Sequence, residues 1–379
     1  MTFAEKVKVA IVGYRGMVGS VLVNRMLEED DFALVDAKFF STSTHGTPAP
    51  KVGKYDLGLI GDANSVTELS KYDIIITCQG GDYTNAMHPQ LRAAGWNGYW
   101  IDAASALRMK DNVSLILDPI NKDQLKAALE AGQKDFAGAN CTVSLMLIGL
   151  GGLFSKGLVE NVIVSSYQAA SGAGAANMRE LIEQFGALHS HVEAELADKS
   201  KTMLDVAAKV QEKLSTDLPA PYFGAPLAAS LIPWIDAKHD HGFTKEEWKG
   251  HAETNKILGF ADNTIKVDST CVRVGVLRSH SQSITLKLKE NLSVEQIEQL
   301  IAEHNKWAYV VPNEKEQTLA RLTPTAVSGT LNIAVGRVRK LSLGDEYVSI
   351  FTVGDQLLWG AAEPLRRMLR LVVGAPLDY

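Results

Sequence analysis

The chain has few cysteines, and their placement excludes two uses of that residue. Cys78, Cys141 and Cys271 are the only three among 379 residues. They are odd in number and widely spaced, which is neither a disulfide framework nor the ligand spacing of a metal site. We therefore expect no metal and a reducing, cytoplasmic location.

The chain also lacks a long hydrophobic run and an excess of positive charge. Its longest apolar stretch, 141–154, is too short to span a bilayer and is typical of a buried helix. The apolar run 7–13 is short and leads directly into a glycine-rich turn, so we expect no signal peptide. The net charge of −6 argues against a nucleic-acid partner, which needs a basic surface. We expect neither a membrane nor a nucleic acid as partner.

The length and the patterning predict two domains. Up to residue 139, apolar segments alternate with helical ones, which is typical of a parallel α/β sheet. The predicted strands are 7–13, 34–40, 73–78, 98–103 and 114–117, and the predicted helices are 17–29, 83–94 and 122–131. This alternation predicts a Rossmann-like N-terminal nucleotide-binding domain.

From residue 140 the pattern changes to that of an α+β domain. The segments 178–191 and 201–214 have helical periodicity. The segment 271–289 alternates apolar and polar residues, which predicts a strand with one polar face in a mixed or antiparallel sheet. The final segment, 355–371, predicts an amphipathic helix.

A glycine-rich turn joins the first predicted strand to the first predicted helix. Gly13, Gly16 and Gly19 are three residues apart. Such glycines allow a tight turn and a close approach of the backbone to a pyrophosphate, and the helix N-terminus favours an anion. The spacing favours a dinucleotide site. The alternative is a tight turn with no ligand.

The end of the second predicted strand favours NADP over NAD. Sites for NAD usually place an acidic residue there, whereas residues 41–44 all carry hydroxyls. Hydroxyls can bind a 2′-phosphate, and Arg15 in the glycine turn could add positive charge. Asp36 lies several residues before the strand end. The alternative is that 41–44 is a polar loop.

Cys141 is the candidate nucleophile. It lies where a strand-like segment meets an apolar helix, between polar Asn140 and Thr142. A helix N-terminus is expected to lower the pKa of a thiol and to supply N–H groups to an oxyanion. The alternative is a small buried hydrophobe.

His280 is the candidate proton-transfer partner, in the predicted strand that also contains Arg273. The two are seven residues apart, so one regular strand would aim them at opposite faces. A bulge at Gly275 would change this parity. Otherwise a shared site requires a curved strand or a loop end.

Eight segments together resemble bacterial aspartate-semialdehyde dehydrogenases, in the same order and over essentially the whole chain. They are 13–19, 77–83, 100–105, 138–142, 167–172, 246–249, 273–280 and 351–356. The resemblance implies a Rossmann-like NADP-binding domain (1–139) completed by a C-terminal helix (355–379), and a catalytic and dimerisation domain (140–354). It also implies a homodimer.

The resemblance also implies residue roles. Cys141 forms an acyl-thioester, His280 is the acid/base and Gln168 orients the substrate. Arg273 binds the substrate carboxylate, Glu246 its amino group, and Arg108 and Lys249 its phosphate. The implied NADP contacts are Arg15, Gly16, Met17, Val18, Thr42, Ser43, Gln79, Ser171, Gly172 and Gln356. The family often has three glycines where this chain has Gly172, Ala173 and Gly174. It can also have a proline near 198–200, where this chain has none.

The implied reaction interconverts L-4-aspartyl phosphate and L-aspartate 4-semialdehyde, in the biosynthesis of lysine and diaminopimelate, threonine and methionine. Three rival interpretations stay open. An N-acetyl-glutamyl-phosphate reductase would use the same thioester chemistry but would not need Glu246. A cysteine hydrolase would leave the glycine turn unexplained, and an NADP-binding sensor would leave Cys141 without a purpose.

Overall fold

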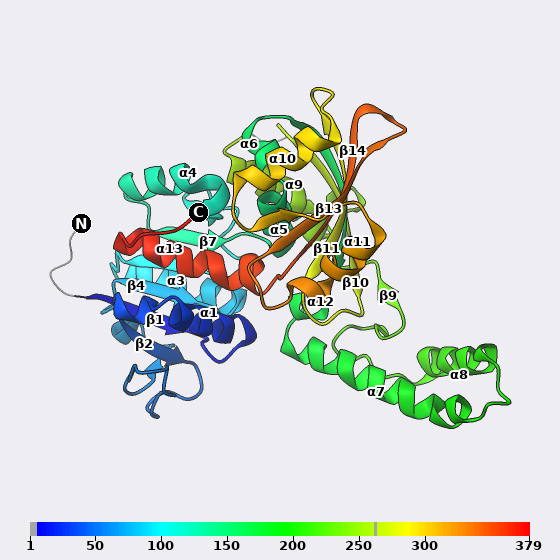
Figure 1. The fold of residues 1–379 in the computed structure, drawn as a ribbon. Coiled ribbons are helices and arrows are strands. Elements are labelled where there is room, and N and C mark those ends of the chain that lie inside the picture. Colours follow the sequence, from blue (N-terminus) through cyan, green and yellow to red (C-terminus); the bar gives the residue numbers. More distant parts are fainter. Residues whose placement is uncertain (1–5, 261–263) are drawn as a thin grey trace.

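The computed structural model describes residues 6–260 and 264–379, so the start of the first predicted domain (1–5) and residues 261–263 lie outside the described residues. Two seven-stranded sheets, each with its own helices, lie side by side (Figure 1). A pair of helices projects from the second sheet as an arm.

The first sheet is parallel throughout and has the order β3-β2-β1-β4-β5-β7-β6. Its direction of winding reverses between β1 and β4, which is where such sheets bind ligands beyond the carboxyl ends of their strands. The strands are β1 (Val7–Val12), β2 (Val35–Ser41), β3 (Gly61–Asp62), β4 (Ile74–Thr77), β5 (Tyr99–Asp102), β6 (Val113–Ile116) and β7 (Asp135–Gly138). The helices are α1 (Met17–Glu28), α2 (Val66–Leu69), α3 (Gly81–Ala93) and α4 (Asp118–Glu130). The predicted Rossmann-like fold is confirmed.

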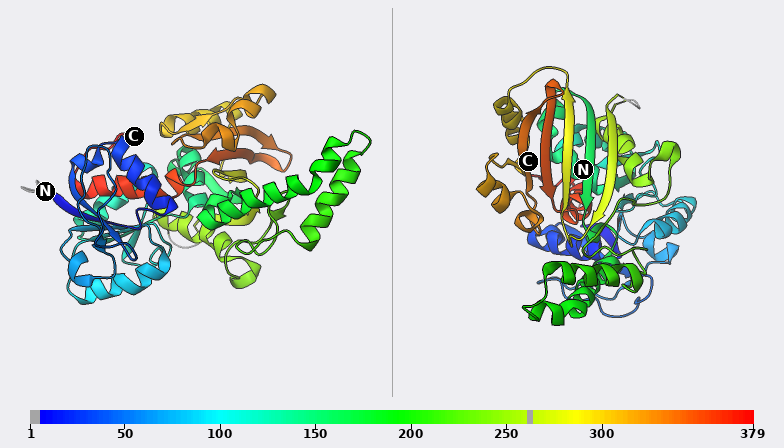
Figure 2. Two further views of the ribbon diagram at one scale, coloured as in Figure 1. Left: turned by 90° about the horizontal axis from the view of Figure 1, so that it is seen from below. Right: turned by 90° about the vertical axis from the view of Figure 1, so that its right-hand side faces the viewer.

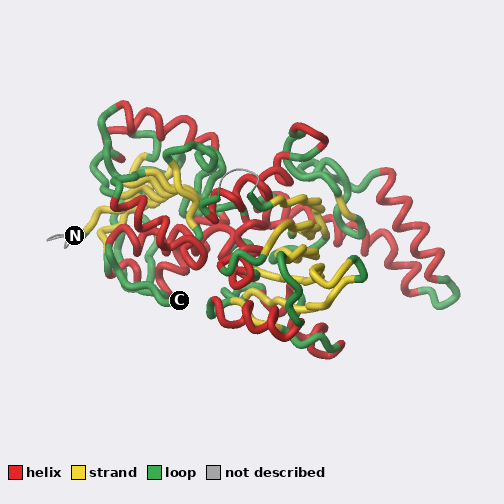
Figure 3. The backbone as a smooth tube through the Cα atoms, turned by 90° about the horizontal axis from the view of Figure 1, so that it is seen from above, coloured by secondary structure: helices red, strands yellow, loops and turns green. Residues whose placement is uncertain are grey.

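The second sheet is mixed, as predicted, with the order β12-β13-β14-β11-β8-β10-β9. Its strands are β8 (Val159–Gln168), β9 (Leu231–Ile232), β10 (Lys266–Val274), β11 (His280–Leu288), β12 (Ala308–Val310), β13 (Ile333–Leu341) and β14 (Gly344–Gly354). Its helices are α5 (Cys141–Gly149), α6 (Gly151–Ser155), α7 (Ala175–Ala197), α8 (Met203–Thr216), α9 (Lys245–Leu258), α10 (Val294–His304), α11 (Lys315–Arg321) and α12 (Pro324–Val327). The two helices of the arm are α7 and α8, which extend away from both sheets (Figure 3).

The prediction of one strand over 271–289 is wrong. The segment contains the end of β10 and all of β11, joined by residues 275–279. The two strands lie on opposite sides of β8, with Arg273 opposite Gln168 and Ser281 opposite Tyr167. Arg273, near the end of β10, and His280, at the start of β11, therefore lie at the same end of the sheet. Their proximity does not require a bulge at Gly275. The loop-end alternative is the one that holds.

Two predicted helices differ from the structure in length. The apolar stretch 141–154 is buried as expected, but it forms α5 and α6, which are separated at Leu150. The amphipathic segment 355–371 starts as a helix only at residue 358, with a π-helical turn (Leu358–Ala362). The regular helix α13 spans Glu363–Val373. The residues before the turn line the candidate site described below.

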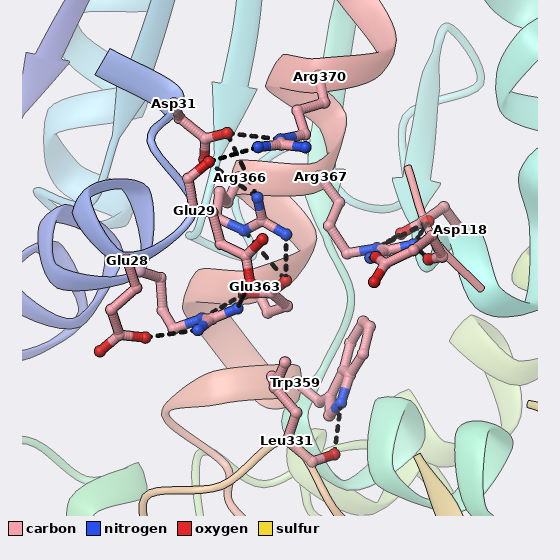
Figure 4. A network of polar contacts seen from close by, with 12 residues as sticks. Glu28, Glu29, Asp31, Asp118, Leu331, Trp359, Glu363, Arg366, Arg367 and Arg370 are labelled. Carbon is pink, nitrogen blue, oxygen red and sulfur yellow. Dashed lines mark hydrogen bonds and ion pairs between the residues drawn. The ribbon is translucent and has the colours of Figure 1, made fainter. Parts of the chain in front are cut away.

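The C-terminal helix α13 packs on the first sheet and is held there by buried ion pairs (Figure 4). Arg366 donates to Asp31 at 3.1 Å and to Glu363 at 2.6 Å, and all three are buried. Arg367 donates to both carboxylate oxygens of Asp118, at 2.9 and 2.8 Å. Buried charges need this degree of pairing to be tolerated. The pairs with Asp31 and Asp118 fix the last helix to residues more than two hundred positions earlier.

Within the described residues, no helix is both long enough and apolar enough to cross a membrane.

We predict that Arg367→Met destabilises the protein by about 3–5 kcal/mol, because it leaves the buried Asp118 carboxylate without its cation. Urea denaturation followed by fluorescence measures the free energy of unfolding. The control is Arg321→Met, since Arg321 is exposed, and this change should cost no more than about 0.5 kcal/mol. Equal effects of the two substitutions would contradict the structural role of the Arg367 pair.

Candidate active site

The glycine turn forms one wall of a pocket of about 470 Å³ at the reversal point of the first sheet. Gly13 has a φ of 78°, and a Cβ there would lie 2.9 Å from the backbone of Cys78. A Cβ on Gly19 would lie 2.1 Å from the Gly13 carbonyl oxygen, so α1 could not approach the strand so closely with any other residue. The pocket is lined by Gly13, Tyr14, Arg15, Gly16, Phe40, Ser41, Thr42, Ser43, Cys78 and Gln79.

The predicted cofactor residues lie in two places. Five of them line this pocket, and the Arg15 guanidinium donates to the Ser43 hydroxyl at 3.2 Å. Met17 and Val18 start α1 behind the turn. Ser171, Gly172 and Gln356 lie instead just after strands β8 and β14 of the second sheet, where Gln356 donates to the Ser171 hydroxyl at 2.8 Å. A cofactor that contacts all ten predicted residues would therefore extend from the glycine turn to the cavity that Cys141 lines.

A second cavity, of about 320 Å³, is lined by Cys141 and Gln168 among others, and the buried His280 lies behind Cys141. The ends of β8 and β10 and the start of β11 lie at one edge of the mixed sheet. They bring Gln168, Arg273 and His280 together. Cys141 is the first residue of α5, as predicted, and Asn140 caps that helix by accepting from Thr142 N at 2.9 Å.

Cys141 and His280 are in contact. The sulfur of Cys141 lies 3.3 Å from Nε2 of His280, which is fully buried. The backbone N–H of Ala169 donates to Nδ1 of His280 at 3.1 Å. A backbone N–H can only donate, so we assign the proton of the neutral imidazole to Nε2, facing the sulfur. The imidazole is therefore oriented as a proton donor to the reacting atoms.

Burial keeps both members of this pair uncharged. It raises the pKa of the Cys141 thiol to about 12, and the nearby Glu246 carboxylate acts in the same direction. Burial and the positive charge of Arg273 lower the pKa of His280 to about 3. The expectation that the helix N-terminus would lower the thiol pKa is therefore wrong. Loss of water around the sulfur outweighs the three neighbouring cations Arg108, Arg273 and Lys249, which act to lower the pKa.

Glu246 lies at the centre of the polar wall of the cavity. Its carboxylate accepts hydrogen bonds from Asn140 Nδ2 at 3.0 Å, Gln168 Nε2 at 3.1 Å and Lys249 Nζ at 3.0 Å. Burial alone would raise the pKa of Glu246, but the Lys249 ammonium and these hydrogen bonds outweigh it and lower the pKa. Glu246 is therefore an anion at neutral pH, well placed for an ammonium group.

The three predicted substrate cations line the same cavity. Arg273 donates to the Ala169 carbonyl at 2.8 Å, and burial lowers its pKa. Lys249 also donates to Asp236 at 2.7 Å. Arg108 pairs with Glu253 at 3.2 Å. The cavity thus presents two guanidinium groups and an ammonium to any anionic substrate.

Sequence reasoning missed three features of this wall. Gly360, in the π-helical turn, lies against the nucleophile, since a Cβ there would be 2.6 Å from the Cβ of Cys141. Glu253 shares a helix face with Glu246 and Lys249, and that spacing of three to seven residues could have indicated it. Asp236 lies in a loop and leaves no sequence signal. Among the residues the structure describes, no cluster of three or more potential metal ligands occurs.

Family comparisons agree with this arrangement. Residues 8–128 match the profile "Semialdehyde dehydrogenase, NAD binding domain", and residues 150–359 match "Semialdehyde dehydrogenase, dimerisation domain". The class is therefore an oxidoreductase of the semialdehyde dehydrogenase type. A solved aspartate semialdehyde dehydrogenase from Francisella tularensis has 48% identity and a TM-score of 0.92, over 97% of this chain and 99% of that one. The chain belongs to the aspartate-semialdehyde dehydrogenase family.

More distant structures share the fold. Aspartate semialdehyde dehydrogenase II from Vibrio cholerae, complexed with ASA, has 23% identity and a TM-score of 0.79, over 98% of this chain and 99% of that one. Aspartate semialdehyde dehydrogenase with NADP from Candida albicans has 17% identity and a TM-score of 0.64, with the same coverage.

We predict that iodoacetamide alkylates Cys141 slowly at pH 7. The rate should rise about tenfold per pH unit through pH 9 with no plateau, because the reactive thiolate increases until the pH reaches the raised pKa. Peptide mass spectrometry distinguishes Cys141 from Cys78 and Cys271, and Cys141→Ser provides the blank. A plateau near pH 7 would show instead that the thiol is ionised in the resting protein.

Proposed function

We propose that the protein is an NADP-dependent phosphorylating dehydrogenase that interconverts L-4-aspartyl phosphate and L-aspartate 4-semialdehyde through a thioester on Cys141. The observation that carries this proposal is the contact of Cys141 with His280 at 3.3 Å, where Cys141 lines a cavity together with Glu246 and three cations. The pathways are those of lysine and diaminopimelate, threonine and methionine. We propose a cytoplasmic location because all three cysteines are free thiols.

The charges of the cavity correspond to those of this substrate. Arg273 can bind the α-carboxylate through two parallel hydrogen bonds. The Glu246 carboxylate would bind the ammonium group, and Gln168, which donates to Glu246, would fix the substrate beside the sulfur. Arg108 and Lys249 would bind the phosphate. An N-acetylated substrate would leave the Glu246 anion facing a neutral amide, which disfavours the rival reductase.

The pocket at the glycine turn fits the adenosine part of NADP. Its glycines allow the tight turn and the close packing of α1 that a pyrophosphate-binding turn requires. Ser43 and Thr42 offer hydroxyls, and Arg15 offers a positive charge, where a 2′-phosphate would lie. When bound, NADP accepts or returns the hydride at the substrate carbon. Met17, Val18 and Gln79 at the turn, and Ser171, Gly172 and Gln356 near Cys141, complete the proposed cofactor contacts.

The chain's own residues account for the bond changes around this hydride exchange. In the oxidative direction the sulfur adds to the aldehyde carbon, the S–H bond breaks and the carbonyl oxygen gains a proton. The N–H of His280 Nε2 stabilises the charge on that oxygen during addition. Oxidation to the thioester removes the carbon-bound hydrogen as hydride and releases the hydroxyl proton to solvent. An oxygen of hydrogen phosphate then attacks the acyl carbon, the C–S bond breaks and the phosphate gives up its proton. The released sulfur regains a proton, with His280 as the acid/base.

We also propose the domain division 1–139 plus 355–379 for NADP binding and 140–354 for catalysis and dimerisation. A homodimer is supported by the dimerisation-domain profile over residues 150–359. The strands of the second sheet face the viewer without a covering helix in the right-hand view of Figure 2. Along β8 the outward residues include Ile163, which is 57% exposed, and Tyr167. A second copy of the chain would cover these apolar side chains.

We predict a kcat/KM at least about a hundredfold higher for L-aspartate 4-semialdehyde than for N-acetyl-L-glutamate semialdehyde, because loss of a charged partner in a desolvated site costs about 2–5 kcal/mol. NADPH absorbance in the presence of phosphate measures both rates. Glu246→Gln should reduce the ratio of the two kcat/KM values, because it removes the anion that binds the free ammonium group. A preference for the acetylated compound would overturn the Glu246 role and the proposed substrate together.

We further predict a kcat/KM at least about tenfold higher with NADP than with NAD, equivalent to about 1.4 kcal/mol. Ser43→Asp should reduce this preference because its carboxylate would repel a 2′-phosphate. The control is Ser70→Asp, which adds the same charge at an exposed position outside the pocket and should leave the preference unchanged. Equal use of NAD and NADP by the unaltered protein would rule out the cofactor assignment.

A further inference from the structure

The carboxylate of Glu253 is buried beside the candidate site and belongs to none of the roles proposed so far. It lies on α9, two turns after Glu246, and is only 1% exposed. A buried carboxylate is costly unless it is paired and hydrogen-bonded, so its partners indicate what it is for.

One oxygen of Glu253 holds the predicted phosphate-binding guanidinium. Arg108 Nη1 lies 3.2 Å from Glu253 Oε1, and Arg108 Nη2 donates to the Ala103 carbonyl at 3.3 Å. Arg108 Nε is buried and has no hydrogen-bond partner in the described part of the chain. Glu253 and Ala103 therefore orient the guanidinium.

The other oxygen of Glu253 holds the residue that precedes the nucleophile. The backbone N–H of Asn140 donates to Glu253 Oε2 at 2.6 Å. The side chain of Asn140 donates to Glu246 at 3.0 Å and, through its oxygen, caps the helix that starts at Cys141. Two carboxylates from one face of α9 thus fix both the backbone and the side chain of Asn140.

We infer that Glu253 is a positioning residue that sets Arg108 at a fixed place relative to Cys141. The Glu253 carboxylate contacts both Arg108, the proposed phosphate-binding cation, and the backbone N–H of Asn140, next to Cys141. It therefore fixes the position of the bound phosphate relative to the thioester carbon. Displacement of a reacting group by about 1 Å can cost a hundredfold in rate, which makes such a link useful. This inference rests on the proposed function, because it assumes that Arg108 binds phosphate.

The test is Glu253→Gln, assayed in the oxidative direction with inorganic phosphate as the varied substrate. An amide has only one oxygen to accept from two donors. The shorter bond to Asn140 is retained, and the amide NH₂ faces the Arg108 guanidinium, so Arg108 loses its anchor. We expect the KM for phosphate to rise at least tenfold, while the KM for aldehyde and the Kd for NADP stay within threefold.

Two comparisons separate positioning from general damage. The matched control is Glu247→Gln. Glu247 lies on the same helix, and its carboxylate accepts hydrogen bonds from the backbone N–H groups of Thr244 and Cys271. It should lower stability without changing the KM for phosphate. In an Arg108→Ala background, Glu253→Gln should change the phosphate dependence less than twofold further, because residues that act as a unit are not additive.

The possible results are distinct. An unchanged KM for phosphate in Glu253→Gln, or a full additional effect in the Arg108→Ala background, would overturn the inference alone. An unaltered protein that shows no phosphate-dependent turnover would overturn the proposed function and the inference with it. If Glu253→Gln does not fold, Glu253→Asp keeps the charge but shortens the reach, and it should raise the KM for phosphate by the same mechanism.

Discussion

The contact between the Cys141 sulfur and the His280 imidazole is the constraint on which the rest of the site depends. It joins the start of α5 to the start of β11, two segments 139 residues apart in sequence. Each partner is fixed from behind. Asn140 caps the helix that starts at Cys141, the Ala169 N–H fixes the imidazole, and Gly360 has no Cβ that would clash with the Cβ of Cys141. The surrounding burial leaves both groups neutral, so reactivity depends on this geometry and on the substrate rather than on a preformed thiolate.

The C-terminal segment connects this site to the nucleotide-binding sheet. After β14 the chain passes Gln356, beside the candidate site, and Gly360, against the nucleophile, before α13 packs on the first sheet. The buried ion pairs of Arg366 and Arg367 fix that helix in place. This segment is far from both the glycine turn and Cys141 in sequence, yet it contacts both the nucleotide-binding sheet and the candidate nucleophile. This continuity makes residues 355–379 part of the proposed catalytic arrangement as well as of the fold.

Much of this arrangement is predictable from sequence, and the failures have physical causes. The glycine turn, the parallel sheet and the helix starting at Cys141 follow from local patterns. The loop before His280 does not, because strand-like segments flank residues 275–279 on both sides and these five residues contain no proline to mark the break. Periodicity likewise does not distinguish the π-helical turn at Gly360 from regular helix. The direction of the Cys141 pKa shift was mispredicted because burial by segments distant in sequence raises this pKa. Asp236 was missed because its place in the site depends on its tertiary contact with Lys249.

The central claim is that the acyl group is carried on Cys141, and direct detection of that intermediate tests it. The protein is incubated with L-aspartate 4-semialdehyde and NADP without phosphate, quenched in acid, digested and analysed by mass spectrometry. The account predicts an aspartyl adduct on the Cys141 peptide alone, which disappears when phosphate is added before the quench. Turnover without any adduct, or an adduct on Cys78 or Cys271, would contradict it.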